Sequence, residues 1–146
     1  MTTTLYDTDF ATWAHEQAEH LRAKRITKLD YDHLAEEIES VGKSDWRALE
    51  HHLKNLILHC LKWDHQPQER ARRGRGWQVS MDNARDALEQ ILRDNRSFQP
   101  RIDAAMAWAY PRARRSAQKQ TGLPLAVFPE TSAWRFDQFM DEDLWR

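Results

Sequence analysis

The sequence predicts an all-α protein, a single-domain bundle of about four main helices around a long central helix, with an aromatic C-terminal tail. Strong helix formers, chiefly alanine, leucine, glutamate, glutamine and arginine, dominate the segments with regular apolar spacing. The chain has only 4 glycines and none of the Asn-Gly or Asp-Gly pairs that mark hairpin turns. Its length of 146 residues is typical of one domain. We therefore expect residues 1–146 to form one helical domain.

Composition also limits the environment and the partners of the chain. A single cysteine, Cys60, rules out an intramolecular disulfide and is typical of a reducing, cytoplasmic setting. The N-terminus has no signal-peptide pattern, and no stretch reaches the roughly 18 apolar residues that a membrane span needs. The net charge of -1 gives no global attraction to nucleic acid or anionic lipid. We expect a cytoplasmic protein without a cofactor or membrane contact, which would bind a polyanion only through a local basic patch.

The first helix is expected to begin at Asp7, because aspartate is a favourable N-cap. It is predicted to end near Arg25, where basic residues complement the helix dipole. Apolar and small residues recur on one face, which we expect to pack inward: Phe10, Trp13, Ala14, Gln17, Ala18 and Leu21.

A long central helix is predicted from Asp30 to Trp63, which would span roughly 50 Å at ~1.5 Å per residue. Gly42 creates an ambiguity: it could end one helix before Ser44 caps the next, or lie inside a continuous helix at a cost of ~1 kcal/mol. The spacing of apolar residues stays in register on both sides of Gly42, which favours one continuous helix. Other helices are expected to pack on its apolar face, which carries Leu34, Ile38, Val41, Leu49, Leu53, Leu56 and Cys60.

The second half of the chain is predicted to hold a loop, two helices and the tail. The loop covers Asp64 to Gly76, which lacks apolar periodicity and contains one proline and two glycines. The helices follow over about Arg75 to Asp94 and over Ser97 to Thr121, the second with an expected kink at Pro111. The tail is rich in aromatic residues, so we expect it to pack back over the bundle rather than expose a large apolar patch.

The predicted loop interleaves arginines with tryptophans. Guanidinium groups bind oxyanions bidentately and stack on aromatic rings, so the segment could hold a phosphate, a carboxylate or a nucleic acid. It could equally dock on the acidic residues Glu36, Glu37 and Glu39, or remain a solvated loop. The candidates for anion binding are Lys62, Arg70, Arg72, Arg73, Arg75 and Trp77. A second basic group, without interleaved aromatics, indicates a charged solvent face on the last long helix: Arg112, Arg114, Arg115 and Lys119.

Polar residues interrupt the apolar face of the central helix at Asp45, His52 and His59, seven residues apart. The two histidines would lie roughly 10 Å apart along the axis, too far to bind one metal unless other helices supply ligands. They are interpreted either as core-edge histidines bonded to neighbouring carboxylates or carbonyls, or as a functional polar cluster. A metal-binding bundle would combine them with a carboxylate such as Glu36 or Glu37.

Arg47 and His52 also match the short pattern R-x-x-x-x-H, which resembles the motif of the HEPN ribonucleases. The resemblance implies a small helical bundle that dimerises to assemble its site. In such an enzyme His52 would act as acid or base at the scissile phosphate. Arg47 would stabilise the developing charge.

Several stretches form a distinctive combination: YDTDFATWAHEQAEHLR at the start, HCLKW and QP around the end of the central helix, Trp77, TGLP, FPETSAW and DEDLW. In this combination, which covers essentially the whole chain, the sequence resembles the bacterial DUF29 family of uncharacterised proteins. The resemblance implies an α-helical domain and no known activity, substrate or catalytic residue. Pro111 departs from what we expect of the fourth helix in this family.

The favoured functional hypothesis is a non-enzymatic cytoplasmic binding or protein-interaction module, with an anionic partner held by the Arg/Trp segment. It depends on that one cluster and on the lack of convergent catalytic groups in the sequence. Two alternatives stay open. One is the HEPN-like ribonuclease, with Arg47, His52 and His59 as the catalytic candidates, and the other is the metal-binding helical bundle.

Overall fold

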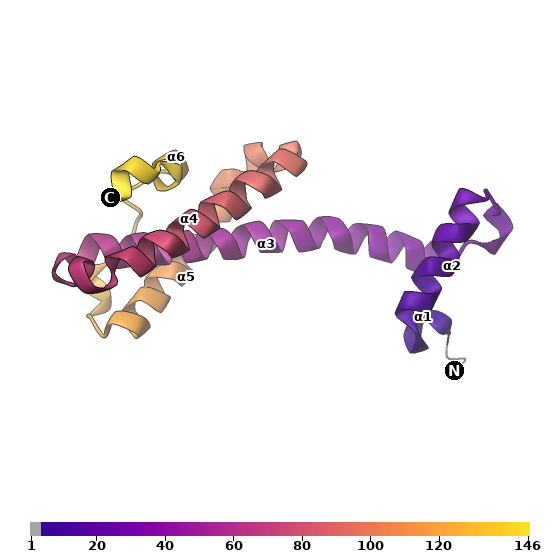
Figure 1. Cartoon of the computed structure of the whole chain (residues 1–146), viewed down its shortest axis with the longest axis horizontal. Coiled ribbons are helices and arrows are strands. Elements are labelled where there is room, and N and C mark those ends of the chain that lie inside the picture. The colour runs from indigo at the N-terminus through magenta and orange to yellow at the C-terminus, as the bar shows by residue number, and fades with distance from the viewer. Residues whose placement is uncertain (1–3) are drawn as a thin grey trace. The chain divides into compact units, whose positions relative to one another are not determined.

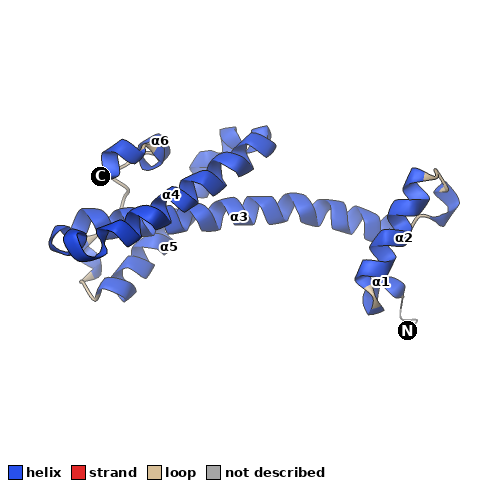
Figure 2. Cartoon of the chain, viewed as in Figure 1, coloured by secondary structure: helices blue, strands red, loops and turns tan. Residues whose placement is uncertain are grey.

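Helices are the only regular secondary structure over residues 4–146, which are those that the computed structural model describes. Helices joined by short loops make up this part of the chain, and no strand occurs in it (Figure 2). The all-α prediction is therefore confirmed. The main helices are α1 (Leu5–Thr8), α2 (Phe10–Arg22), α3 (Tyr31–His65), α4 (Arg70–Asp94), α5 (Ile102–Thr121) and α6 (Phe136–Met140) (Figure 1).

Short 3-10 helices lie between these helices and at the end of the chain. They are η1 (Ile26–Lys28), η2 (Pro67–Glu69), η3 (Arg96–Arg101), η4 (Leu125–Val127) and η5 (Glu142–Trp145). Contacts between residues divide the chain into two compact units, one extending to Ser44 and the other covering Asp45–Arg146. The single domain expected from the sequence stays a prediction. Within residues 4–146, no helix is both long and apolar enough to cross a membrane.

The central helix α3 runs without a break through Gly42, as the continuous apolar phase predicted. Asp30 accepts a hydrogen bond from the backbone N–H of His33 at 3.4 Å, so it acts as the expected N-cap. However, the apolar face of α3 is not covered along its whole length. Ile38 and Val41 remain 72% and 64% exposed, so their predicted place in the core is wrong.

In the first unit, α2 packs on the start of α3 through aromatic and polar contacts. The helix begins two residues later than predicted, because Asp9 rather than Asp7 caps it, through the backbone N–H of Thr12 at 3.1 Å. Of its expected inward face only Trp13 and Gln17 are buried. The Trp13 indole donates to Asp30 at 3.1 Å, and the Gln17 side chain accepts from the backbone N–H of Asp30 at 2.8 Å.

The core of the second unit lies between α3, α4, α5 and the tail. Leu53 and Leu56 of α3 and Met81 and Leu88 of α4 are fully buried. The inward face of α5 consists mainly of alanines at steps of three or four, which let this helix approach its neighbours closely. The tail packs back over the bundle as predicted, since its aromatic residues are buried at Phe128, Phe139 and Trp145.

The boundaries of α4 and α5 differ from the sequence-based prediction. The stretch expected to form a loop over 64–76 is largely helical, because α3 continues to His65 and α4 begins at Arg70. Its alanine, arginine and glutamate residues favour helix, and this preference outweighs the two glycines. At the other boundary the first five residues of the expected helix over 97–121 belong to η3, and α5 begins only at Ile102.

Candidate anion-binding site

A polar recess of about 210 Å³ lies in the second unit, where α3 ends, α4 begins and α5 ends. Three of the anion-binding candidates, Lys62, Arg73 and Trp77, line it. They come from two helices that the short η2 segment joins. The other lining residues were not predicted: Gln66, Glu69, Gln120 and Thr121.

Close contact between α3 and α4 shapes this end of the unit. A Cβ atom built on Gly74 would lie 2.8 Å from Cζ3 of Trp63, so only glycine fits here without a shift. The Arg70 guanidinium lies over the Trp63 ring, 4.8 Å from its centroid, and its Nε donates to the Trp63 carbonyl oxygen at 2.9 Å. Arg70 thereby binds one of the carbonyls left free at the end of α3. It stabilises the helix junction and does not line the recess.

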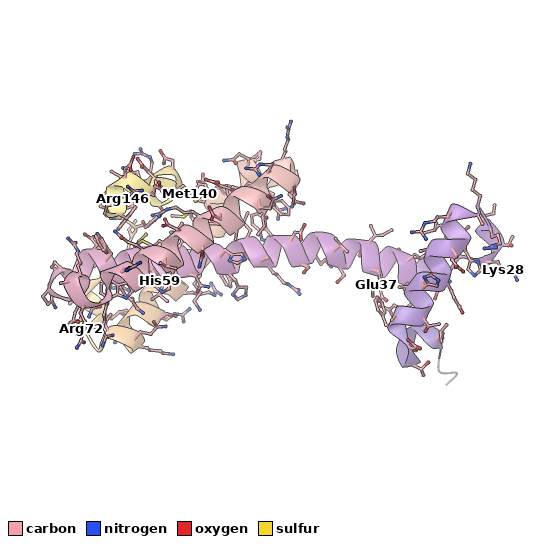
Figure 3. All side chains as sticks on the ribbon, viewed as in Figure 1. Lys28, Glu37, His59, Arg72, Met140 and Arg146 are labelled. Atoms are coloured by element: carbon pink, nitrogen blue, oxygen red, sulfur yellow. The ribbon has the colours of Figure 1, made fainter. Side chains whose placement is uncertain are left out.

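Glu69 compensates part of the positive charge. It pairs with Arg72 at 3.2 Å and with Arg73 at 3.6 Å. The acidic partner of these arginines is therefore a residue one helical turn away in the sequence. Figure 3 labels Arg72 at this end of the unit, where its side chain is largely exposed.

Lys62 carries the least compensated charge in the recess. Its ammonium donates a hydrogen bond to the side-chain oxygen of Gln120, which leaves two of its three donors available. Partial burial, and then the positive charge of Arg73, lower the pKa of Lys62. An anion placed between Lys62 and Arg73 would relieve their repulsion and replace the lost hydration of the lysine.

The two candidate histidines lie elsewhere in this unit. His52 and His59 line a shallow recess of about 240 Å³ between α3 and α4, together with Asn55, Ser80, Asn83 and Ala84. The Nδ1 atom of His59, the histidine labelled in Figure 3, lies 2.7 Å from the backbone oxygen of Asn55, and burial lowers the pKa of this imidazole. This bond to a backbone carbonyl matches the core-edge interpretation for His59.

Arg47 and His52 do not both line the recess described above. Arg47 is exposed, and it is not among the residues that line the recess of His52. Asp45, the third polar residue of the series, instead accepts a hydrogen bond from the Asn95 side chain at 3.2 Å. The HEPN-like ribonuclease stays a prediction without a specific observation in its favour.

The comparison with protein families agrees with the resemblance seen in the sequence. A family model for the domain of unknown function DUF29 matches residues 5–145. The chain belongs to this family. A search of curated proteins and a search of solved structures gave no significant match.

Metal ligands do not converge in the part of the DUF29 chain that is described. No group of three or more His, Cys, Asp or Glu residues there could hold a metal ion. The only cysteine, Cys60, is fully buried, with its Sγ 3.4 Å from the sulfur of Met81, and burial raises the pKa of the thiol well above its usual range. Cys60 is therefore a core residue, as its place on the apolar face indicated.

The six candidates for anion binding in this DUF29 chain thus separate into two groups. Lys62, Arg73 and Trp77 share the recess, whereas Arg70 and Arg72 contact Trp63 and Glu69, and Arg75 is exposed. Sequence reasoning missed Gln120 and Thr121 because they are more than forty residues away from the other lining residues. Only the packing of α5 beside α3 brings them to the recess.

Proposed function

We propose that this DUF29 chain is a non-enzymatic cytoplasmic binding module that engages an anionic partner through the recess of Lys62 and Arg73. The observation that carries the proposal is the placement of two cations from different helices in one partly enclosed, polar recess. Cations held this way repel each other unless an anion lies between them.

The neighbouring side chains fit an oxyanion. Gln66 and Gln120 supply amide donors, and Arg73 offers a planar fork that can bind two oxygens at once. Glu69 fixes Arg73 from one side, so the guanidinium is held near the recess before a ligand arrives. The combination favours a phosphate or carboxylate group on a larger partner, because a recess of this size would enclose only the charged group.

A titration with pyrophosphate tests the proposal. The full chain is titrated at low salt by isothermal calorimetry, since screening weakens contacts of this kind. We expect binding that weakens at least about tenfold in Lys62→Ala and in Arg73→Ala, because each substitution removes a charged hydrogen-bond donor. Arg93→Ala is the matched control, since it removes the same charge from an exposed position near the far end of α4.

Two results would contradict the proposal. One is the absence of any binding heat with the folded wild-type chain. The other is an equal loss in the Arg93→Ala control, which would indicate a general charge effect without a site. Each variant is checked for folding by circular dichroism before the titration.

A further inference from the structure

A second basic surface runs along α5 in the second unit. Trp108, Arg112 and Lys119 follow one another at steps of four and seven residues, so they share one face of this helix. Arg101, the last residue of η3 and the N-cap residue of α5, precedes Trp108 by seven residues. From Arg101 to Lys119 this face is roughly 27 Å long at ~1.5 Å per residue. The sequence had indicated a basic strip without aromatics here, but the structure adds an indole from the same helix and another from α3.

Residues of α3 contact this surface at three points. The Arg101 guanidinium lies over the Trp46 ring, 4.1 Å from its centroid. The His51 and Trp108 rings pack edge to face with their centroids 5.2 Å apart. Nearer the end of both helices, the Lys62 ammonium donates a hydrogen bond to Gln120. The contacts of η3 and α5 with α3 therefore follow the same order along the chain as the residues of α3 that they meet. We call this surface the α3–α5 strip, defined by Trp46, His51, Lys62, Arg101, Trp108, Arg112 and Lys119.

Within residues 4–146, the cations of the strip form no ion pair with a carboxylate. Among the ion pairs of the described residues, none involves Arg101, Arg112 or Lys119. The positions between them on the same face of α5 include alanines, Pro111 and Arg115, and carry no acidic residue. A strip of this kind attracts a chain of negative charges even though the whole protein has a net charge of -1.

The two indoles are partly buried, and an arginine lies over each ring. Arg112 lies over Trp108, 4.4 Å from the ring centroid, and its Nη1 donates to the Trp108 carbonyl oxygen at 2.8 Å. A guanidinium that lies on an indole can move to a phosphate and leave the ring face to a base. Alternating cations and aromatic faces are what proteins use to hold single strands, whose phosphates and bases are both accessible.

We propose that the α3–α5 strip binds single-stranded nucleic acid, with phosphates on Arg101, Arg112 and Lys119 and bases stacked on Trp46 and Trp108. This inference rests on the proposed function and names its partner class, since Lys62 belongs both to the strip and to the anion recess. A bound strand would run along α5 and place one phosphate in the recess. A duplex would bind less well, because its paired bases cannot stack on the indoles.

The test uses the full chain and a labelled oligouridine of about 15 nucleotides, a length that spans the usual site sizes for single strands. Binding is followed by fluorescence anisotropy at several salt concentrations, and stacking is followed by quenching of tryptophan fluorescence. The double variant Arg101→Gln/Arg112→Gln should weaken binding on the order of tenfold. The double variant should also reduce the slope of log affinity against log salt concentration by about 1.4 in magnitude, because each phosphate contact on a single strand contributes about 0.7.

Trp108→Leu separates stacking from charge, since it keeps an apolar side chain beside the core and leaves the net charge unchanged. It should lower the affinity for oligouridine and reduce the quenching, with little change in the salt slope. The matched control is Arg93→Gln/Arg96→Gln, which removes the same two charges from exposed positions outside the strip. This control should bind as the wild type does. Folding of each variant is confirmed by its urea unfolding curve.

Three results would overturn the inference. A duplex of the same length that binds as tightly as the single strand would exclude base stacking. An equal loss of affinity in the control variant would indicate a diffuse charge effect. Binding to vesicles of anionic lipid but not to oligouridine would assign the strip to a membrane surface. If pyrophosphate binding at Lys62 and Arg73 persists in any of these cases, the proposed function stands and only the choice of nucleic acid fails.

Discussion

Replacing Gly74 by alanine should weaken the junction of α3 and α4, although the same change normally stabilises a helix. Glycine costs roughly 1 kcal/mol relative to alanine inside a helix, so the substitution gains about that amount in helix propensity. The added methyl group, however, would lie 2.8 Å from Cζ3 of Trp63. The Trp63 ring cannot yield easily, because the Arg70 guanidinium stacks on it. Overpacking of this kind costs roughly 1–3 kcal/mol.

Gly76 provides the matched control, because it lies two residues further along the same helix with no atom within 4 Å of the place where a Cβ would be. Gly76→Ala should therefore gain about 1 kcal/mol in the free energy of unfolding. The propensity gain is common to both variants, so the difference between them measures the overpacking and should be about 1–3 kcal/mol. Urea unfolding followed by circular dichroism measures both free energies, provided that the m-value stays constant.

A Gly74→Ala variant as stable as Gly76→Ala would refute the reasoning. It would mean that Trp63 moves aside at little cost and that the approach of α3 and α4 does not depend on glycine. A second variant, Trp63→Leu combined with Gly74→Ala, tests the cause directly. Removal of the ring should restore most of the propensity gain if Trp63 is the obstacle, so that the two changes are not additive.

Three further predictions concern the core and the titrating groups. Leu53→Ala should destabilise the chain by about 2–5 kcal/mol because Leu53 is fully buried, whereas Val79→Ala, at a half-exposed site in α4, should stay within about 0.5 kcal/mol in the same urea assay. Asp30, 2.6 Å from Nδ1 of His33, raises the pKa of that imidazole, so Asp30→Asn should lower the pKa seen by NMR titration. The stabilisation by the Asp30–His33 pair is complete below the ordinary histidine pKa and is lost as pH rises through the raised pKa of His33. The wild type should therefore exceed Asp30→Asn in thermal stability by more at about pH 6 than at about pH 9. Cys60 should react with a thiol reagent only in denaturant, because the folded core excludes the reagent and raises the pKa of the thiol.

The helical fold could be predicted from the sequence because apolar spacing at three and four residues is a direct consequence of helix geometry. The single helix through Gly42 followed from the same spacing, because a second helix would have begun its apolar spacing out of register with the first. The packed tail followed from the cost of exposing so many aromatic side chains. Each of these inferences uses a local property that the residues retain whatever their tertiary partners are.

The candidate site could be predicted only in part, because its residues converge through tertiary packing. Lys62, Arg73 and Trp77 lie near one another in the sequence, and their clustering was visible. Gly74 indicated a loop, yet its role is to let α4 approach Trp63. The contacts of Arg101 with Trp46 and of Trp108 with His51 join residues more than fifty positions apart, so no pattern of spacing could indicate the α3–α5 strip.

The exposure of Ile38 and Val41 shows why an apolar face does not by itself identify the contact face of a helix. In the first unit the shorter helices pack on a different side of α3, where Asp30, His33 and Glu37 recur at steps of three and four. Tyr6 stacks on His33 with ring centroids 3.9 Å apart and donates a hydrogen bond to Glu37. This side of α3 is polar in sequence, but its hydrogen bonds are made by aromatic partners that also bury apolar area. Apolar periodicity therefore located the core face of α3 in the second unit, where leucines carry the packing. It failed for the part of α3 in the first unit, where tyrosine and tryptophan pack instead.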